Sequence, residues 1–356
     1  MKINFILSSL NDSHFLKRVQ EFIDHGYDVK VFGFRRKGLP SPNVLFPMQE
    51  LGEIACGNYL GRLVLFRRTI KQIAEKRLEG LFFYSSLDIA LFATRYIKSP
   101  YIYEVCDLTE LRIPNLLVRN WLLIQNKRVI KHSLQTIITS EGYIDFFKSI
   151  KGDKFSLIPN KVSAYCPQSL PRERRFDKHK INIGFVGVIR FQTIYNFIKI
   201  AAGKTNIIMH LFGFYAEGDL ASEDMKKIVE INDNVIFHGP FKNPETLPAI
   251  YKQLDIVLCA YPPTPGIIYA EPNKLYEAIY FRCPIIVSKG TFLGRKVAQL
   301  NVGYVIDAMD EKDIEQYISS INEEDYNQKV ESCEKIPQSE CLNMNDGFFE
   351  KLRTLY

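Results

Sequence analysis

The feature that most constrains this fold is an alternation of short apolar runs with longer amphipathic runs along the 356 residues. The apolar runs have the length and composition of strands buried on both faces, and the amphipathic runs have the period of helices. Strands that alternate with helices favour a parallel sheet covered by helices. We therefore predict an α/β protein with two Rossmann-like, doubly wound parallel-sheet domains that face a cleft.

The expected strands are mostly apolar and short. In the first half they are Lys2–Leu7, Asp28–Phe34, Leu81–Tyr84, Tyr101–Val105, Thr136–Thr139 and Ser156–Ile158. In the second half they are Ile181–Val186, Ile207–Phe212, Val235–Phe237, Asp255–Cys259, Ile285–Val287 and Gly303–Ile306. Helices are expected between strands, over about His14–His25, Tyr59–Leu78, Pro114–Ser133 and Tyr195–Ala202.

The domain boundary is expected where this alternation stops. Residues 161–180 contain two prolines and many charges but no apolar periodicity, which is typical of a linker. Residues 1–160 would then form the first domain and residues 181–330 the second. Residues 331–356 are expected to be a helical tail that packs back on the body.

Charge is distributed unevenly. Residues 1–180 contain 29 Lys/Arg and 17 Asp/Glu, a net charge of +12, whereas residues 181–356 contain 17 and 23, a net charge of −6. A basic domain can meet nucleic acid, an anionic membrane or an acidic ligand. Nucleic-acid binding is not expected, because no aromatic stacking platform or binding motif is evident. Basic amphipathic stretches at Tyr59–Leu78 and residues 111–131 favour an anionic membrane surface, although core-packing helices with basic rims would look similar.

Several features predict a cytoplasmic protein. No segment approaches the roughly 18–20 apolar residues that span a bilayer. Met1–Leu10 has the pattern of a first strand and not that of a signal peptide. Seven cysteines without a CxxC pair favour neither a disulfide framework nor a zinc site, and fit a reducing compartment.

The strongest functional signal lies in residues 269–288. A loop containing Glu271, Asn273 and Lys274 opens an expected helix that carries Glu277. A helix N-terminus offers N–H groups to an anion, and Lys274 can neutralise a phosphate. A carboxylate beside them can accept hydrogen bonds from vicinal hydroxyls. The combination predicts a site for a phosphorylated ligand that bears a sugar ring.

These residues resemble GT-B glycosyltransferases of the broad family 4 (group 1) type over nearly the whole chain. The motifs that carry the resemblance are YIYEVCDL (Tyr101–Leu108), Ile158-Pro159-Asn160, VIFHG (Val235–Gly239), YKQLDIVL (Tyr251–Leu258), PNKLYE (Pro272–Glu277) and the following Cys283–Val287. The resemblance implies a second domain that binds a nucleoside-diphosphate sugar of the UDP or GDP type, and no other cofactor.

The chain departs from the family pattern at two places. The first glutamate of the usual pair would stand at position 269, which is Tyr269, and the nearest carboxylate is Glu271. The usual Arg…Lys pair is incomplete, because Tyr195 follows five residues after Arg190. Lys274 is expected to supply the missing charge, as in relatives with a P-x-K-x-x-E motif such as bacterial polysaccharide glucuronosyltransferases.

Donor binding is assigned to six residues through this resemblance. Gly187 would let backbone approach the diphosphate, and Arg190 would contact it. Lys274 would bind phosphate or a sugar carboxylate, and Glu277 would accept from ribose hydroxyls. For Glu271 and Asn273, contact with the donor and a purely local role at the helix start are both open. The sequence has no D-x-D pair, so we expect no metal.

Catalysis is assigned to the basic domain. Asp107 follows a strand whose end should face the cleft, and it is the first candidate for the general base. A helix-capping aspartate is the competing interpretation, and a retaining reaction would change its role to positioning. His14, in the first strand-to-helix loop, is the second candidate, and Glu141 is a weaker third.

The resulting prediction is a metal-independent glycosyltransferase of bacterial surface polysaccharide assembly, capsular or exopolysaccharide. Its acceptor would be a glycan or a lipid-linked oligosaccharide, and it could be peripheral on the inner face of the cell membrane. Two alternatives remain: a nucleotide-sugar 2-epimerase of the same fold, and a catalytically degenerate subunit that binds a glycan or partner. The sequence leaves open the donor sugar, the acceptor, the linkage, the anomeric outcome and the oligomeric state.

Overall fold

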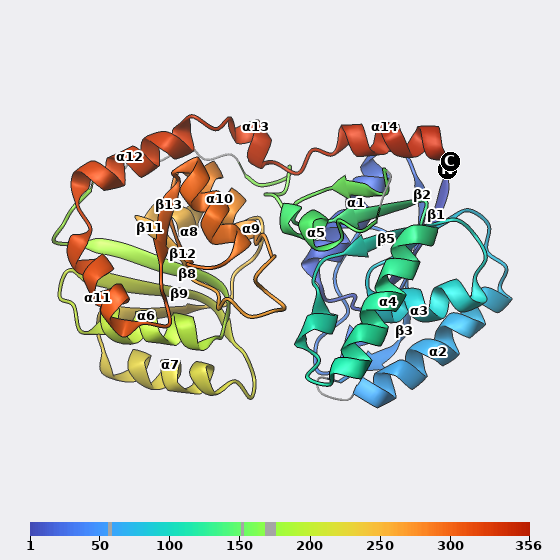
Figure 1. The fold of residues 1–356 in the computed structure, drawn as a ribbon, viewed down its shortest axis with the longest axis horizontal. Coiled ribbons are helices and arrows are strands. Elements are labelled where there is room, and N and C mark those ends of the chain that lie inside the picture. The colour runs from blue at the N-terminus through green and yellow to red at the C-terminus, as the bar shows by residue number, and fades with distance from the viewer. Residues whose placement is uncertain (56–58, 151–152, 168–175) are drawn as a thin grey trace. The chain divides into compact units, whose positions relative to one another are not determined.

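The chain forms two compact units, each an α/β domain on one parallel sheet (Figure 1). The first unit contains Met1–Pro159 and Asn345–Tyr356, and the second contains Asn160–Met344. Part of the expected linker, residues 168–175, lies outside the described residues. The computed structural model describes residues 1–55, 59–150, 153–167 and 176–356.

The sheet of the first unit has seven strands in the order β3-β2-β1-β4-β5-β6-β7, and all neighbours are parallel. Its strands are β1 (Lys2–Leu7), β2 (Asp28–Arg36), β3 (Met48–Ile54), β4 (Leu81–Tyr84), β5 (Tyr101–Val105), β6 (Gln135–Ile138) and β7 (Phe155–Leu157). The central strand β1 places Phe5 and Ile6 on opposite faces, and both are fully buried. Helices therefore cover both faces of this sheet.

The helices of the first unit connect successive strands and include the last element of the chain. They are α1 (Ser13–Asp24), α2 (Tyr59–Glu75), α3 (Leu87–Tyr96), a 3₁₀ turn (Thr109–Arg112), α4 (Leu116–His132), α5 (Glu141–Phe146) and α14 (Asp346–Leu355). Helix α14 lies beside α1, where the rings of Phe22 and Phe349 are 4.9 Å apart (Figure 1). The last twelve residues thus complete the core of the first unit.

The sheet of the second unit has six parallel strands in the order β10-β9-β8-β11-β12-β13. They are β8 (Ile181–Ile189), β9 (Ile207–Tyr215), β10 (Val235–Gly239), β11 (Ile256–Cys259), β12 (Ile285–Ser288) and β13 (Gly303–Ile306). The chain first adds strands on one side of β8 and then crosses to the other side at β11. This reversal makes the carboxyl ends of β8 and β11 a switch point, where ligands bind in such sheets.

Helices connect these strands and extend beyond the last one. They are α6 (Gln192–Ala202), α7 (Leu220–Ile231), α8 (Leu247–Gln253), α9 (Asn273–Tyr280), α10 (Phe292–Leu300), α11 (Glu311–Ser320), α12 (Glu323–Glu334) and α13 (Gln338–Cys341). Helix α9 packs seven buried residues between the sheet and its neighbours, which fixes the start of the helix firmly. No helix in the described part of the chain is long and apolar enough to cross a membrane.

The predicted α/β class with two Rossmann-like parallel-sheet domains is confirmed, and the differences from the expectation include strands β3 and β8. Strand β3 was not predicted, because MQELGEI has few large apolar residues and lies half-exposed at the sheet edge. Strand β8 runs three residues beyond the expected Val186. Gly187 therefore lies inside the strand, paired with Gly213, and not in the following turn. A Cβ on Gly213 would lie 1.8 Å from the Gly187 carbonyl oxygen, so this pair needs glycine.

Candidate functional site

A pocket of about 230 Å³ lies in the second unit at the switch point of the sheet. Its walls come from the end of β8, the segment after β10, the segment after β11 and the start of α9. The lining residues are Val186, Gly187, Val188, Arg190, Phe241, Asn243, Tyr261, Asn273, Lys274 and Glu277. Five of the six residues assigned to donor binding from the sequence therefore meet in one pocket.

Lys274 is the buried cation of this pocket. It is 6 % exposed, and a Cβ on Gly187 would lie 2.9 Å from its Nζ. Gly187 has a φ of +141°, which other residues rarely adopt, so both the backbone and the space require glycine here. Burial opposes the charge on Lys274, yet Tyr261, Cys259 and Glu277 around it raise its pKa above the usual value. Lys274 is therefore a buried ammonium ion that lies against the backbone of Gly187, where no side chain intervenes.

Glu277 is a fixed acceptor on the same helix. It is 3 % exposed, and its two oxygens accept from the Tyr251 hydroxyl at 2.8 Å and from Asn273 Nδ2 at 2.5 Å. Burial and the nearby Glu277 carboxylate raise the pKa of Tyr251, so its hydroxyl remains a donor. The side chain of Asn273 thus holds Glu277, and the helix N-cap position is occupied by Pro272.

Arg190 stands at the rim of the pocket, directly after β8. It is exposed, and its guanidinium lies 4.6 Å from the ring centre of Phe191, which stacks beneath it. Phe191 has a φ of +81°, an uncommon backbone conformation that begins the turn into α6. The pocket therefore combines a buried cation, an exposed cation at its rim and one carboxylate.

Glu271 lies apart from these residues, outside the pocket lining as far as the structure is described. Its carboxylate is 5 % exposed, accepts from the Tyr276 hydroxyl and pairs with Lys296 Nζ at 2.7 Å. The second oxygen, Oε2, is buried with no partner among the described residues. Lys296 compensates the charge of Glu271 locally, and so this carboxylate is not an additional anion in the pocket.

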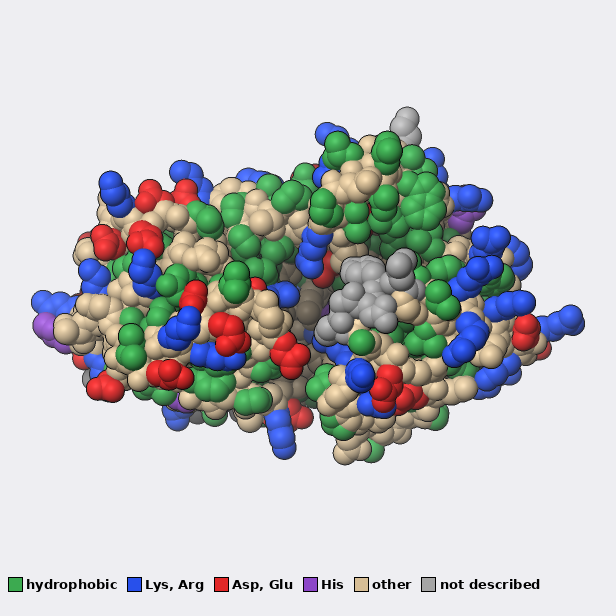
Figure 2. All heavy atoms as spheres, turned by 90° about the horizontal axis from the view of Figure 1, so that it is seen from below, with side chains coloured by type: hydrophobic (Ala, Val, Ile, Leu, Met, Phe, Trp, Pro, Cys, Tyr) green, Lys and Arg blue, Asp and Glu red, His purple; other side chains and the backbone are tan. Residues whose placement is uncertain are grey.

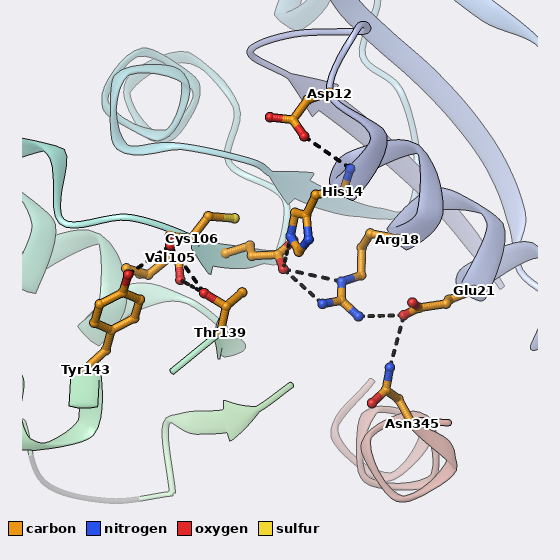
Figure 3. Close-up of polar contacts among 10 residues, drawn as sticks. Asp12, His14, Arg18, Glu21, Val105, Cys106, Thr139, Tyr143 and Asn345 are labelled. Atoms are coloured by element: carbon orange, nitrogen blue, oxygen red, sulfur yellow. Dashed lines mark hydrogen bonds and ion pairs between the residues drawn. The ribbon is translucent and has the colours of Figure 1, made fainter. Parts of the chain in front are cut away.

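A second cluster of charged residues is buried in the first unit (Figure 3). Glu104 on β5 is fully buried, and its Oε1 accepts from His14 Nε2 at 2.9 Å and from Arg18 Nη2 at 3.0 Å. Arg18 also pairs with Glu21, which accepts from Asn345 Nδ2 at 3.1 Å. Burial alone would raise the pKa of Glu104, but Arg18 and His14 lower it to about 2.

His14 is thus placed inside this cluster. Its side chain is 12 % exposed, and Nδ1 is buried with no partner among the described residues. His14, Glu104 and Cys106 could offer ligand atoms within 4.8 Å of one another to a metal ion. However, Arg18 already places positive charge on Glu104, and a cation there would face repulsion from the guanidinium.

Asp107 lies next to this cluster but is accessible. Its side chain is 52 % exposed, 3.9 Å from Arg112, and it lines a groove of about 1930 Å³ within the first unit. The Tyr143 hydroxyl and Thr139 Oγ1 donate to the Cys106 carbonyl at 3.0 and 3.2 Å, which holds the preceding peptide in place (Figure 3). Glu141, the weaker candidate, begins α5 and is exposed.

Four residues that shape these sites were not singled out from the sequence. They are Arg18, Glu104, Tyr251 and Tyr261. Glu104 and Tyr251 stand inside motifs already noted, YIYEVCDL and YKQLDIVL, where an ionisable or hydroxyl group in an apolar run was an available signal. Arg18 had no such signal, because a basic residue on an amphipathic helix is ordinary.

Comparison with solved structures shows that the chain has the GT-B fold of two Rossmann-like domains. Sucrose-phosphate synthase from Thermosynechococcus elongatus is similar with a TM-score of 0.75 and 14 % identity, over 100 % of both chains. HepE from Anabaena, solved with UDP and glucose, gives a TM-score of 0.72 and 13 % identity over 99 % of both chains. WaaG, a glycosyltransferase involved in lipopolysaccharide biosynthesis, gives 0.67 and 14 % over 93 % of both chains.

The second unit is also matched at the level of sequence. Residues 168–338 match the family model of glycosyl transferases group 1, and this segment contains every residue that lines the 230 Å³ pocket. The match therefore covers most of the second unit. No curated protein matches the sequence.

Proposed function

We propose that this protein is a glycosyltransferase that takes its sugar from a nucleoside diphosphate bound in the pocket of the second unit. The observation that carries the proposal is the buried ammonium of Lys274 beneath Gly187, with the fixed carboxylate of Glu277 one helical turn away. Among the charged residues that line the pocket, the buried Lys274 and the exposed Arg190 face a single carboxylate, that of Glu277. An anionic ligand would balance this excess of positive charge.

The proposed chemistry follows from these charges. When the bond between the sugar and the diphosphate breaks, negative charge grows on the departing phosphate oxygen. Lys274 and Arg190 would stabilise that charge without a metal ion, and a preorganised buried cation does so most effectively. Glu277 would accept from the ribose hydroxyls and fix the register of the donor. A chelator should accordingly leave turnover unchanged.

The donor is proposed to be a UDP- or GDP-sugar. The match of the second unit to the group 1 family supports a nucleotide sugar, and HepE, with the same fold, was solved with UDP and glucose. We propose Asp107 as the group that receives the proton of the acceptor hydroxyl if the reaction inverts the anomeric centre. In a retaining reaction it would position the acceptor.

The acceptor is proposed to be a glycan or lipid-linked oligosaccharide of bacterial surface polysaccharide assembly. The basic net charge of residues 1–180 supports a site at the cytoplasmic face of the cell membrane, where such acceptors are presented. WaaG, which shares the fold, is described as involved in lipopolysaccharide biosynthesis. The groove beside Asp107 would hold the acceptor.

The test is calorimetric titration of the full chain with UDP and GDP. Lys274→Met should weaken binding of the preferred nucleotide by ~10- to 100-fold, because a charge-assisted hydrogen bond contributes ~1.5–3 kcal/mol. Gly187→Ala should weaken it as well, because its Cβ would meet Lys274 Nζ. Lys312→Met, an exposed residue of α11, is the matched control. Unchanged affinity in both pocket variants would refute the site.

A binding subunit without catalysis is the second candidate, and the placement of Glu271 favours it. The carboxylate nearest to the usual family position pairs with Lys296 outside the pocket lining. Incubating the donor alone and with lipid or glycan acceptors separates the possibilities. Transfer identifies the enzyme proposed here, and a changed sugar without acceptor identifies an epimerase. Nucleotide binding with neither product identifies the degenerate subunit.

A further inference from the structure

Helix α4 of the first unit presents large apolar side chains to solvent. Leu117, Trp121 and Ile124 are 82 %, 54 % and 63 % exposed. Their spacing of four and three residues places them on one side of the helix. The opposite side is buried through Val129 and Ile130, so the exposed side is not the one that holds α4 to the unit. Isolated exposed apolar residues are ordinary, but three on one face form a contiguous patch.

The same face becomes basic toward the end of the helix. Arg128 and Lys131 continue the spacing of Leu117, Trp121 and Ile124, and both are exposed. Residues 111–140 contain no Asp or Glu, so no acidic side chain of this segment neutralises them. Figure 2 shows the first unit on the right, with a group of hydrophobic side chains near its top and Lys and Arg side chains beside it. The face thus joins an apolar half to a cationic half.

We infer that this face of α4 docks on an anionic lipid surface. Leu117, Trp121 and Ile124 would enter the boundary between headgroups and acyl chains, where tryptophan is favoured because its ring is apolar and its N–H is polar. Arg128 and Lys131 would contact the anionic headgroups. The charge pattern favours an anionic lipid surface. An apolar contact with a neutral protein surface would leave Arg128 and Lys131 without an anionic partner.

Docking through this face of α4 would place one end of the groove that Asp107 lines next to the lipid surface. Val118 and Trp121 belong both to the exposed first turns of α4 and to the groove lining, which continues along α3 and α4 to Asp107. The groove would receive the apolar part of a lipid-linked acceptor from the bilayer. This step rests on the proposed function and narrows the acceptor to a lipid-linked one.

Trp121 provides the test, because it is the only tryptophan of the chain. The full chain is titrated with phosphatidylcholine vesicles with and without phosphatidylglycerol, and the tryptophan emission is recorded. With anionic vesicles we expect a blue shift, quenching by lipids brominated on their acyl chains, and reversal by high salt. Binding without any change in emission would overturn the inference, and so would equal binding to neutral vesicles.

Variants separate α4 from the rest of the surface. Leu117→Ser with Ile124→Ser should lower vesicle partitioning by at least ~10-fold, because two buried side chains are lost from the lipid. Leu220→Ser is the matched control, since Leu220 is 83 % exposed on α7 of the second unit, and it should partition as the natural chain does. Self-association in the absence of vesicles that Leu117→Ser abolishes would assign the face to a second copy and overturn the inference.

The two proposals fail separately. Insertion of Trp121 without sugar transfer to any acceptor would leave the docking face intact and refute the enzyme. Transfer to a soluble glycan at the rate found for a lipid-linked acceptor, without vesicle binding, would keep the enzyme and refute the docking face. Transfer that prefers a vesicle-borne acceptor, and loses that preference in the Leu117/Ile124 double variant, supports both.

Discussion

The two units each bury a cluster of charged residues near the carboxyl ends of their central strands, and the clusters differ in how they are balanced. In the first unit, Arg18 lies between Glu104 and Glu21, and all three belong to one hydrogen-bonded network. In the second unit, Lys274 and Arg190 share a pocket with Glu277 alone. In the first cluster each charged side chain is paired within the network, and in the second two cations face one carboxylate in a pocket.

The difference separates a structural role from a binding role. Desolvating a charge is so costly that it is tolerated only with a partner, and a cluster that supplies its own partners gives no reason to expect a ligand. A perturbed buried cation beside a pocket is different, because its natural partner can be an anion from solution. By the same argument, Asp107 is a better candidate for the general base than His14, because His14 is paired with Glu104 and Asp107 is accessible.

The largest effect on the rate of sugar transfer is expected at Asp107. If the buried cluster of His14, Arg18 and Glu104 carries the chemistry instead, the comparison between the two units fails. Asp107→Asn should lower the rate of sugar transfer by ~10²- to 10⁴-fold and leave nucleotide affinity unchanged, because an amide cannot accept a proton from the acceptor. Transfer rate and calorimetry on the same preparation measure both quantities. Asp145→Asn, an exposed position on α5, is the control. Full activity of Asp107→Asn would remove Asp107 from catalysis.

The next effect concerns the stability of the first unit. Arg18→Leu leaves Glu104 buried without its main compensating charge, and it should lower the free energy of unfolding by ~3–5 kcal/mol. Trp121 lies in the first unit, so its fluorescence in a urea titration reports unfolding of that unit.

The double variant Arg18→Leu with Glu104→Leu provides the control for this measurement. It removes both charges, and we expect it to recover a large part of the lost stability. A double variant less stable than Arg18→Leu would mean that the network contributes more than mutual compensation of charge. Nucleotide affinity should not change in either variant, because the pocket lies in the second unit.

The fold could be predicted from sequence because its signal is local and repeated. Buried parallel strands are continuous apolar runs, and the order of strands and helices follows the chain. Strand β3 carries no such run, since its half-exposed edge position does not demand one. The longer extent of β8 was also hidden, because Gly187 looks like a turn residue until its partner Gly213 is known.

The site could be predicted only where its residues lie close in sequence. Asn273, Lys274 and Glu277 share one helical turn, and the spacing itself indicates a common face. The partner of Glu277 is Tyr251, 26 residues earlier, and the partner of His14 is Glu104, 90 residues later. Such contacts depend on which strands become neighbours, so local sequence patterns could not predict the pairing of His14 with Glu104.

The smallest effect is on stability at low pH, where the two units should differ. Glu104 has a pKa of about 2 against an ordinary 4.5, so its contribution is complete above pH 4.5 and is lost as the pH falls from 4.5 to about 2. In the second unit, burial, His238 and Lys180 lower the pKa of His210 from 6.5 to about 4. The unfolded chain then binds the extra proton, so stability is lost as the pH falls from 6.5 to about 4. As the pH is lowered, the second unit should therefore begin to lose stability at a higher pH than the first unit.

Hydrogen exchange resolved by peptide tests this order, with β9 reporting the second unit and β5 the first. His210 accepts at Nδ1 from His238 Nε2 at 3.0 Å and donates from Nε2 to Asn182 Oδ1 at 3.2 Å, which the neutral ring satisfies. His210→Gln removes one of two titrating groups, because burial also lowers the pKa of His238. Between pH 6.5 and 4, exchange in β9 should then depend less on pH, after correction for intrinsic rates. Exchange in β5 should keep its response below pH 4.5. Loss of protection in both strands at one pH would mean that the units unfold together, and the two clusters would then contribute to a single stability.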